Sequence, residues 1–398
     1  MVRFMNRSID LLEELAEETA NSFGLNRRGY IFLTADEARA QTFGANAGAN
    51  SALGAGPVRL HDGTNSIATY QKSELHGFDP ALTGVDLITD RNLIQQNYPF
   101  LNSEIRALLH PRRCGWFSAQ QLGMYLLERA KEAGVKFVSG SVIGVELDEE
   151  QVRGVNIRNT TGEAIIQTNT FVVAAGPYIK NVAAMLGVDL PVFNELHAKI
   201  AFKDYLGIVP RDVPMMILSD PLHLPWTDEE CAELEEDEKT HCLLEELPGG
   251  AHFRPEGRED SPILLMLWTY DVEPVEPVWP PTFDPLYGEV VLRGLTKMIP
   301  GLKAYVGKMG RPYIDGGYYC KTQENRPLIC PLPVEGAYML GAISGYGQMA
   351  SQAAGDLLAA YITGNELPGY APAFHLDRYD DPEYRKMLER WNPRTGQL

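Results

Sequence analysis

The most informative residues for function lie near the end of the chain, where a strand-like run is interrupted by glycines. Residues 337–350 read AYMLGAISGYGQMA, with glycine at positions 341, 345 and 347. A helix is predicted to follow over residues 349–362 and to end at Gly364. A strand that turns through glycine into a helix brings unpaired backbone N–H groups and the positive end of the helix dipole to one point. Such a point can bind phosphate or the negatively polarised edge of a cofactor ring. A purely structural turn would look the same, so this stretch alone leaves both interpretations open.

A helix, a strand and a loop are predicted near the start of the chain. Ser8 can cap a helix that runs to about Phe23, with Gly24 at the C-cap position. Residues 30–33 are predicted to form a strand. Residues 44–56 are rich in Gly, Ala and Asn without periodicity, which predicts a loop.

A second helix is predicted further along, with a strand after it. Ser118 should cap a helix over residues 119–133 that stops at Gly134, and residues 135–138 should form the strand.

Alternating residues then predict a small antiparallel meander. It covers residues 142–158 and 163–168 and leads into FVVAAG, residues 171–176, a buried strand that ends on glycine. The order of helix, strand, meander and glycine-ended strand is typical of a dinucleotide-binding fold.

The middle of the chain has a different character. Residues 194–311 are rich in proline and contain strand-like runs at 199–202, 215–218 and 263–268. Residues 228–238 hold eight acidic residues in eleven. This run could be a docking surface or a solvated helix or loop, and we favour the solvated segment.

Composition excludes several classes of partner. The formal net charge of −18 argues against nucleic acid and against an anionic membrane surface, because both require clustered Lys and Arg. No apolar run approaches the roughly 18–20 residues that span a bilayer. Five scattered cysteines form no CxxC pair and no zinc-like grouping, which predicts reduced thiols in an intracellular, cytoplasmic compartment and no metal site.

Three ordered segments resemble one family of flavoenzymes. They read GWFSAQQLGMYLLERAKEAGVKF (115–137), FVVAAGPYIKNVAAMLG (171–187) and DGGYYCKTQENRPLICPLPVEGAYMLGAISGYGQM (315–349). Over nearly its whole length, the chain is similar to the D-amino-acid oxidase, glycine oxidase and sarcosine oxidase superfamily of FAD-dependent oxidoreductases. The resemblance implies an α/β fold in which an incomplete Rossmann-like FAD-binding domain is interleaved with an antiparallel-sheet α+β substrate domain.

The same resemblance implies the domain boundaries. Residues 6–26, 115–189 and 314–367 would form the FAD-binding domain, and residues 27–114 and 191–312 would form the substrate domain. A C-terminal tail would follow at 368–398. Members of the family open with a strand and G-x-G-x-x-G, which this sequence lacks, so the FAD-binding domain is expected to lack its first βαβ unit.

Site residues follow from the resemblance, position by position. Val142 would contact the adenine side of FAD through its backbone, and Ala175 and Gly176 would pass beside the pyrophosphate and ribityl chain. Tyr318 and Tyr319 would face the substrate side of the flavin ring and position the substrate. The residues expected along the ribityl and pyrimidine end are Ser344, Gly345, Tyr346, Gly347, Gln348 and Met349.

The sequence departs from the family at its substrate- and flavin-binding positions. Tyr319 replaces the arginine of G-x-R that binds a substrate carboxylate, and Met349 replaces a lysine of the sarcosine oxidases. Gly317 stands where those enzymes attach the flavin through cysteine, so FAD is expected to bind non-covalently. The usual aspartate after the threonine becomes Glu324 or is lost to Gln323.

Other candidate residues each have two interpretations. Lys199, close to His197, could activate oxygen or pair a carboxylate, but an ordinary, partly exposed lysine is favoured. Arg311 could bind a substrate carboxylate, although a structural ion pair fits its spacing better. The aromatic residues that could wall a pocket, with core packing favoured for each, are Trp268, Tyr270 and Trp279.

The resemblance implies oxidation of the C–N bond of a small amine or amino acid, with hydride transfer to the flavin and hydrolysis of the resulting imine. Two alternatives remain from the sequence. The chain could be a non-catalytic, assembly-factor-like member of the same fold that acts through protein partners, or an inactive fragment.

Overall fold

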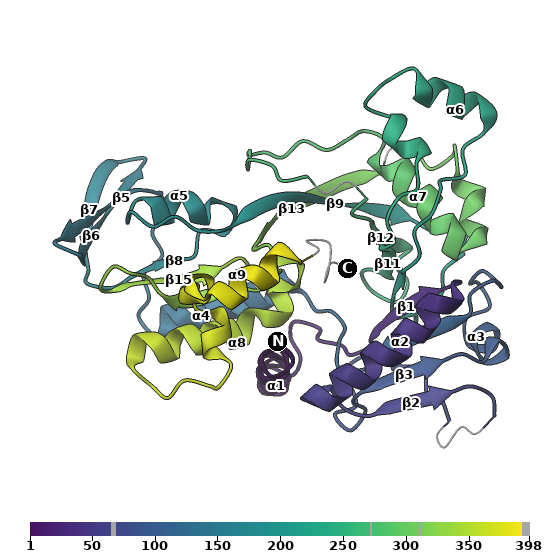
Figure 1. Cartoon of the computed structure of the whole chain (residues 1–398), viewed down its shortest axis with the longest axis horizontal. Helices are drawn as coiled ribbons and strands as arrows, with labels where there is room; N and C mark the ends of the chain where they lie inside the picture. The colour runs from purple at the N-terminus through teal and green to yellow at the C-terminus, as the bar shows by residue number, and fades with distance from the viewer. Residues whose placement is uncertain (65–68, 271–272, 311, 392–398) are drawn as a thin grey trace.

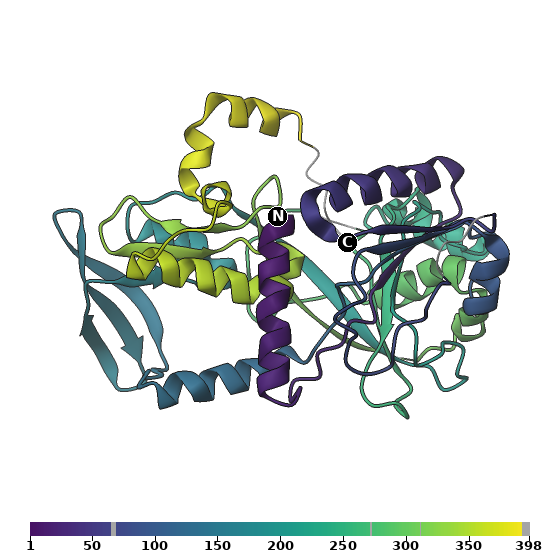
Figure 2. The same ribbon diagram turned by 90° about the horizontal axis from the view of Figure 1, so that it is seen from below.

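The computed structural model describes residues 1–64, 69–270, 273–310 and 312–391. Two parts lie side by side, one built on a large sheet and the other on two small sheets (Figure 1). Helix α1 (Val2–Glu18) stands between them in the view from below (Figure 2). The fold is α/β, as predicted.

The large sheet has nine strands and contains most of the segments predicted for the substrate domain. Its strands are β1 (Tyr30–Thr34), β2 (Val58–His61), β3 (Val85–Ile88), β4 (Ala107–Pro111), β9 (Phe193–Lys203), β10 (Met215–Leu218), β11 (Ala251–Pro255), β12 (Ile263–Leu267) and β13 (Tyr313–Lys321). Their order is β13-β9-β12-β11-β10-β1-β4-β3-β2. Pairing is mostly antiparallel, but β1 pairs with β10 and β2 with β3 in parallel.

One face of this sheet is the main hydrophobic core. Helix α7 (Tyr287–Met298) covers it and contacts β11 and β12, and α3 (Arg91–Asn97) packs near β3 and β4. Each fully buried side chain here contributes roughly 1.5–3 kcal/mol through removal of apolar surface from water. The sheet residues on this face are Ile31, Leu33, Ile200, Phe202, Met216, Leu218, Phe253, Leu264 and Met266.

The smaller part contains the glycine turns. Strands β8 (Phe171–Val173), β14 (Leu328–Pro331) and β15 (Ala337–Gly341) form a three-stranded sheet in the order β14-β15-β8. Helix α8 (Gly347–Thr363) follows β15, and α1 packs along it.

The predicted meander is confirmed as a second three-stranded sheet. It consists of β5 (Ser141–Asp148), β6 (Gln151–Asn159) and β7 (Gly162–Gln167), all antiparallel. The remaining α-helices are α2 (Glu37–Asn50), α4 (Ala119–Glu132), α5 (Ile179–Ala184), α6 (Asp228–Glu235) and α9 (Pro382–Glu389). A π-helical turn, η1, covers Ser51–Ala55, and the 3-10 turns are η2 (Gly176–Tyr178), η3 (His241–Leu244), η4 (Pro300–Tyr305), η5 (Ser344–Tyr346), η6 (Ala371–Phe374) and η7 (Leu376–Asp380).

Local capping signals were read correctly in two helices. The Ser118 side chain accepts a hydrogen bond from the N–H of Gln121 and caps α4. Gly364, with φ of 70°, ends α8 in the left-handed conformation that glycine adopts without strain.

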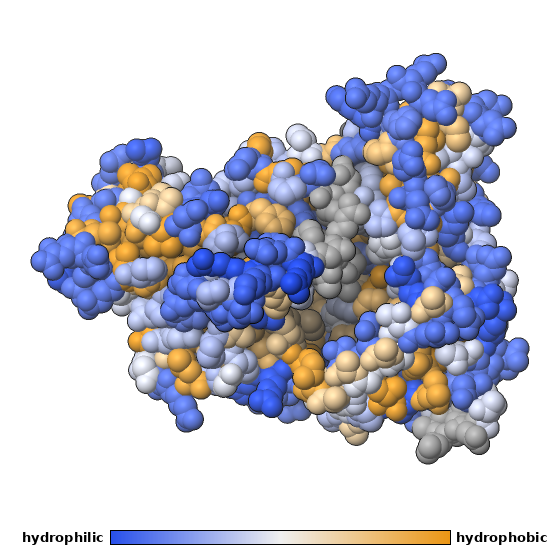
Figure 3. Space-filling model, in the orientation of Figure 1, coloured by the Kyte–Doolittle hydropathy of each residue, from blue (hydrophilic) through white to orange (hydrophobic). Residues whose placement is uncertain are grey.

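The acidic run forms α6, which is solvated as predicted. Its first turn is a capping box in which Thr227 and Glu230 each accept a hydrogen bond from the other's backbone N–H. Hydrophilic residues gather over this part of the molecule (Figure 3).

The first helix was predicted with the wrong bounds. It begins at Val2 and ends at Glu18, so Ser8 lies inside it and Gly24 lies beyond its end. The hydroxyl of Ser8 does not cap α1 but accepts a hydrogen bond, 3.2 Å long, from the N–H of Ala353 in α8. The serine therefore joins two helices.

The loop predicted at 44–56 is also wrong, because α2 and η1 occupy it. Asp36 caps α2 by accepting from the N–H of Arg39. Only Phe43 and Ala47 of this helix are buried, so the sequence shows no apolar stripe.

The strand predicted at 135–138 does not form. Val135 and Phe137 are 57% and 74% exposed, and this segment pairs with no strand in the part of the chain that the structure describes. A strand needs a neighbouring strand for its backbone hydrogen bonds, and the sequence pattern of one segment does not show whether that neighbour is present.

Within the described ranges, no helix is both long enough and apolar enough to cross a membrane.

Candidate active site

Two glycine-containing turns meet at one edge of the small sheet. Strand β15 pairs with β8 in parallel, with Met339 opposite Val173, so both strands end at the same edge. The turn after β8 passes through Gly176, with φ of 55°. The turn after β15 passes through Ser344, also with φ of 55°. Two stretches that lie far apart in the sequence therefore converge.

The start of α8 brings the positive end of its helix dipole to this edge. Tyr346 is its N-cap residue and makes no side-chain capping hydrogen bond, and the 3-10 turn η5 leads directly into the helix. A Cβ atom at Gly176 would meet no described atom within 4 Å, so the neighbouring turn opens onto free space. Both features fit a negatively polarised or phosphate-bearing cofactor.

The second turn lies against the large sheet through Tyr319. A Cβ atom at Gly345 would lie 2.6 Å from Cε2 of the Tyr319 ring, a distance that requires glycine. Tyr319 also stacks on His197 of β9, with ring centroids 3.8 Å apart and planes inclined by 19°. The turn, the tyrosine and the histidine thus form one stack from the small part to the large sheet.

A small cavity of about 70 Å³ lies at this junction. Its walls come from the second turn and from the face of the large sheet opposite the hydrophobic core, which we call the polar face. The lining residues are His197, Ala198, His252, Leu267, Thr269, Tyr319, Lys321, Ser344, Gly345 and Tyr346.

A buried ion pair lies beneath the stack. Lys321 and Glu195 are 1% and 5% exposed, and Lys321 Nζ lies 2.9 Å from Glu195 Oε2. His197 Nε2 lies 3.1 Å from the same oxygen. Burial alone would raise the pKa of Glu195, but hydrogen bonds from His197 and Lys321 hold it below its ordinary value. Glu195 is therefore ionised at neutral pH.

The two histidines at the cavity are neutral at physiological pH. Burial lowers the pKa of His197, although Glu195 opposes this effect. Burial lowers the pKa of His252 to about 4. Nδ1 of His252 lies 2.7 Å from the carbonyl oxygen of Gly250 and donates to it, so Nε2 is a hydrogen-bond acceptor.

The structure separates the two predicted tyrosines. Tyr319 lines the cavity, whereas Tyr318 points to the other face of β13 because side chains alternate along a strand. The Tyr318 hydroxyl is 2.8 Å from both the N–H and the carbonyl oxygen of Val278.

The other predicted cofactor residues fall into three groups. Ala175 and Gly176 form the first turn, and Ser344, Gly345 and Tyr346 line the cavity from the second. Gly347, Gln348 and Met349 begin α8. Val142 lies in β5, in a different sheet from the two turns.

The remaining candidates are placed as follows. Lys199 is partly exposed, with Nζ 3.1 Å from Asp315 Oδ2. Trp268 is buried in the core, whereas Trp279 is 77% exposed. Arg311 lies outside the described residues.

Sequence reasoning missed Glu195, His252 and Lys321 as site residues. All three are polar residues at buried positions of β-strands, on the face that carries Tyr319. Successive side chains in β11 point to opposite faces of the sheet, so His252 faces away from the core because its neighbour Phe253 faces the core. Lys321 and Glu195 are 126 positions apart in the sequence, so no local sequence pattern predicts that they are in contact.

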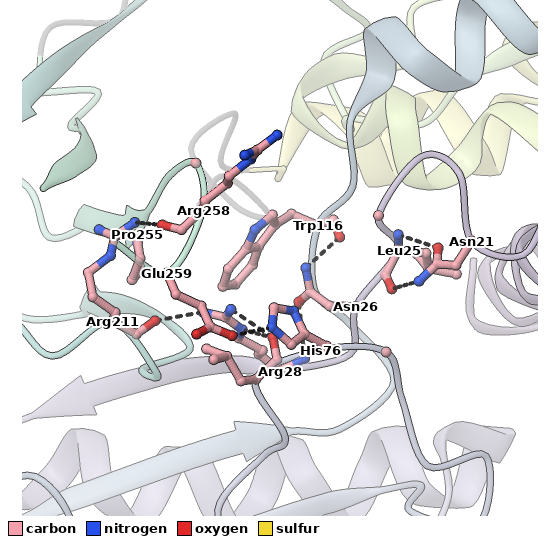
Figure 4. A pocket seen from close by; sticks show the side chains of 14 residues that line it. Asn21, Leu25, Asn26, Arg28, His76, Trp116, Arg211, Pro255, Arg258 and Glu259 are labelled. Carbon is pink, nitrogen blue, oxygen red and sulfur yellow. Dashed lines mark hydrogen bonds and ion pairs between the residues drawn. The ribbon is translucent and has the colours of Figure 1, made fainter. Parts of the chain in front are cut away.

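A larger polar cavity, of about 330 Å³, lies elsewhere (Figure 4). Arg28 stacks on Trp116, 5.0 Å from its ring centroid, and donates to the carbonyl oxygens of Leu75 and Arg211. Arg211 donates to the carbonyl oxygens of Ile263 and Glu256, so two of the three arginines that line this cavity are engaged by backbone carbonyls. Across the described ranges, no group of three His, Cys, Asp or Glu residues could hold a metal ion.

Comparison with known proteins identifies the family. Residues 1–361 match the model of the DAO family, described as FAD dependent oxidoreductase. Similar solved structures include L-proline dehydrogenase from P. horikoshii, with a TM-score of 0.69 and 20% identity over 95% of this chain and 83% of that one. Glycine oxidase from Bacillus cereus has a TM-score of 0.65 and 12% identity over 94% and 83%. Iminodiacetate oxidase from Chelativorans has a TM-score of 0.64 and 16% identity over 94% and 82%. At these identities the likeness shows the fold.

Proposed function

The chain belongs to the DAO family of FAD-dependent oxidoreductases, and from that premise we propose that it oxidises the C–N bond of a small amine or amino acid with non-covalently bound FAD. The observation that carries the proposal is that the two turns lie at one edge of the small sheet and that the second of them lines a cavity with no net charge. The names of the three similar structures give proline, glycine and iminodiacetate as what those proteins act on. All three are small amines or amino acids.

The residues at the two turns fit part of the cofactor. The uncapped start of α8 and the open turn at Gly176 suit the negatively polarised edge of the flavin and its ribityl chain. We assign Ala175, Gly176 and residues 344–349 to this end, and Val142 to the adenine side. FAD, when bound, supplies the acceptor for hydride.

The chain's own residues would bind and orient the amine. Lys321 and Glu195 cancel each other's charge, and both histidines are neutral, so the cavity has no net charge to hold an ammonium ion. An amine must be uncharged at nitrogen to lose hydride from the neighbouring carbon, and this cavity favours that form. Nε2 of His252 can accept an N–H of the amine, while Tyr319, fixed by its stack on His197, limits where the substrate can lie.

We also propose that the division into a cofactor-binding and a substrate-binding domain follows the predicted boundaries, with one qualification. Strand β13 pairs with β9 and so belongs to the large sheet, although the boundary at residue 314 assigned it to the FAD-binding part.

The test is an FAD titration of the purified chain. We expect flavin absorbance to survive desalting, and FAD fluorescence to be quenched in a saturable way. Gly176→Ala should raise the Kd about tenfold or more, because a methyl group would intrude on the turn that faces the cofactor. Gly187→Ala is the matched control: Gly187 also has positive φ and open space around it, but lies at the far end of α5. Loss of all flavin on desalting, without saturable quenching, would contradict the proposal.

A further inference from the structure

A second cavity adjoins the one between the sheet and the turns. It has a volume of about 240 Å³ and shares His197, Ala198 and Thr269 with its neighbour. The first cavity, about 70 Å³, is far smaller than the roughly 300 Å³ of ordinary ligand cavities. It can hold an amine nitrogen and the carbon beside it, but no sizeable side chain.

The two cavities meet where the pairing of β12 with β9 ends. The last pair between these strands joins Leu267 to Lys199. Among the described residues, the next pair with β9 is the bridge between Glu195 and Pro274. Thr269 lies between these points and lines both cavities with His197 and Ala198, so these three residues form the junction of the two cavities.

His197 is held firmly at this junction. Its Nδ1 lies 3.0 Å from the hydroxyl of Thr269, and its other ring nitrogen contacts Glu195. Contacts on both edges of the imidazole, added to the stack with Tyr319, leave the ring little freedom. The junction is thus lined by a fixed imidazole and by the small Ala198.

The second cavity has an aromatic wall. Trp268 meets Tyr270 edge to face, with ring centroids 5.5 Å apart, and Tyr270 stacks on Tyr287 at 6.0 Å. Phe283 adds a fourth ring. Such a wall gives contact surface to an apolar or aromatic group, while the charged residues Lys239, Glu273 and Asp284 line the remainder of the cavity. Together the two cavities reach the lower end of ordinary ligand volumes, about 300 Å³.

We propose that the second cavity binds the side chain of the substrate, and that the substrate class is amines or amino acids with an apolar, ring-sized side chain. This inference rests on the proposed function. The amine end would lie against His252 and Tyr319, and the side chain would pass Ala198 into the aromatic cavity. Ala198 is then the residue that admits or excludes the side chain.

The test compares two amines on the FAD-loaded protein. Equilibrium binding of 2-phenylethylamine and methylamine is followed by calorimetry and by the change in the flavin spectrum. We expect the aryl amine to bind about 10- to 100-fold more tightly, the range that corresponds to burial of one ring. Ala198 lines both cavities, so the readout is the ratio of the two affinities, which Ala198→Val should bring close to one. Ala201→Val, on the same strand but outside both cavities, is the matched control.

The outcomes separate the two proposals. Equal affinity for the two amines, or an aryl preference that survives Ala198→Val, would overturn the assignment of the aromatic cavity while the proposed function stands. If FAD binds but neither amine does, both proposals are overturned.

Discussion

Removal of the buried lysine at the site should have a large and pH-dependent effect on stability. Lys321→Met leaves Glu195 buried and without its closest counter-charge. At 2.9 Å the pair attracts by about 6 kcal/mol at an effective dielectric constant of about 20. Part of this is offset by the desolvation of the lysine, so we expect a loss of about 3–5 kcal/mol in the free energy of unfolding at pH 8.

The dependence on pH follows from Glu195. In the wild type its pKa is lowered, so its contribution to stability is present above the pKa of the unfolded chain and is lost as pH falls through the folded value. In Lys321→Met, burial dominates and raises that pKa instead. The carboxyl then takes up a proton on mild acidification, and the defect should shrink between pH 8 and pH 5.

Urea denaturation at the two pH values measures both effects. The double variant Glu195→Gln/Lys321→Met is the control, because it removes both charges and should recover much of the lost stability. A defect of less than about 1 kcal/mol, or one that grows on acidification, would refute the view that this pair is buried and mutually dependent.

Two smaller effects can be measured in the same way. Between pH 6 and pH 5 the unfolded chain should bind a proton at His252 that the folded chain does not, so the free energy of unfolding falls as the pH falls. His252→Gln should reduce that dependence by about 1.2 kcal/mol per pH unit, and an unchanged dependence would contradict the lowered pKa of His252. Ser8→Ala should cost about 1 kcal/mol, because it removes the buried acceptor for the N–H of Ala353, and an equal loss in Ser351→Ala, whose hydroxyl bonds only within α8, would show that the bond between α1 and α8 contributes nothing.

The features predicted correctly are those whose cause lies within a few residues. A serine followed by an amphipathic run gives the start of α4, and glycine in the left-handed conformation ends α8. Short strand-like runs identified β10 and β12, and alternation identified the meander. Helix α2 was not predicted because only Phe43 and Ala47 are buried, so the sequence of this helix shows no apolar stripe with helical periodicity. The parallel pairing of β1 with β10 joins distant segments and has no local sign.

The candidate site also contains features that depend on neighbouring residues in the sequence and features that depend on the pairing of distant strands. The glycine turns were visible in the sequence because their residue types are dictated locally, and the structure brings the two together. Which of Tyr318 and Tyr319 faces the cavity depends on the register of β13 against β9, in which Tyr319 lies opposite Glu195. That register is set by pairing over the whole strand, so a single-residue shift would have exchanged the two tyrosines.

Strand β13 also explains how the two parts of the molecule keep the site in register. It pairs with β9 from Tyr313 to Lys321, and the chain then re-enters the small sheet at Leu328. The cavity lies at this passage, where a short connection joins the sheet that supplies His197 to the sheet that supplies the glycine turns. The contact of Tyr319 with Gly345 and the ion pair of Lys321 with Glu195 both lie at the end of that strand. A displacement of either part would have to break the stack or expose the ion pair, which favours a preformed site over one assembled by domain movement.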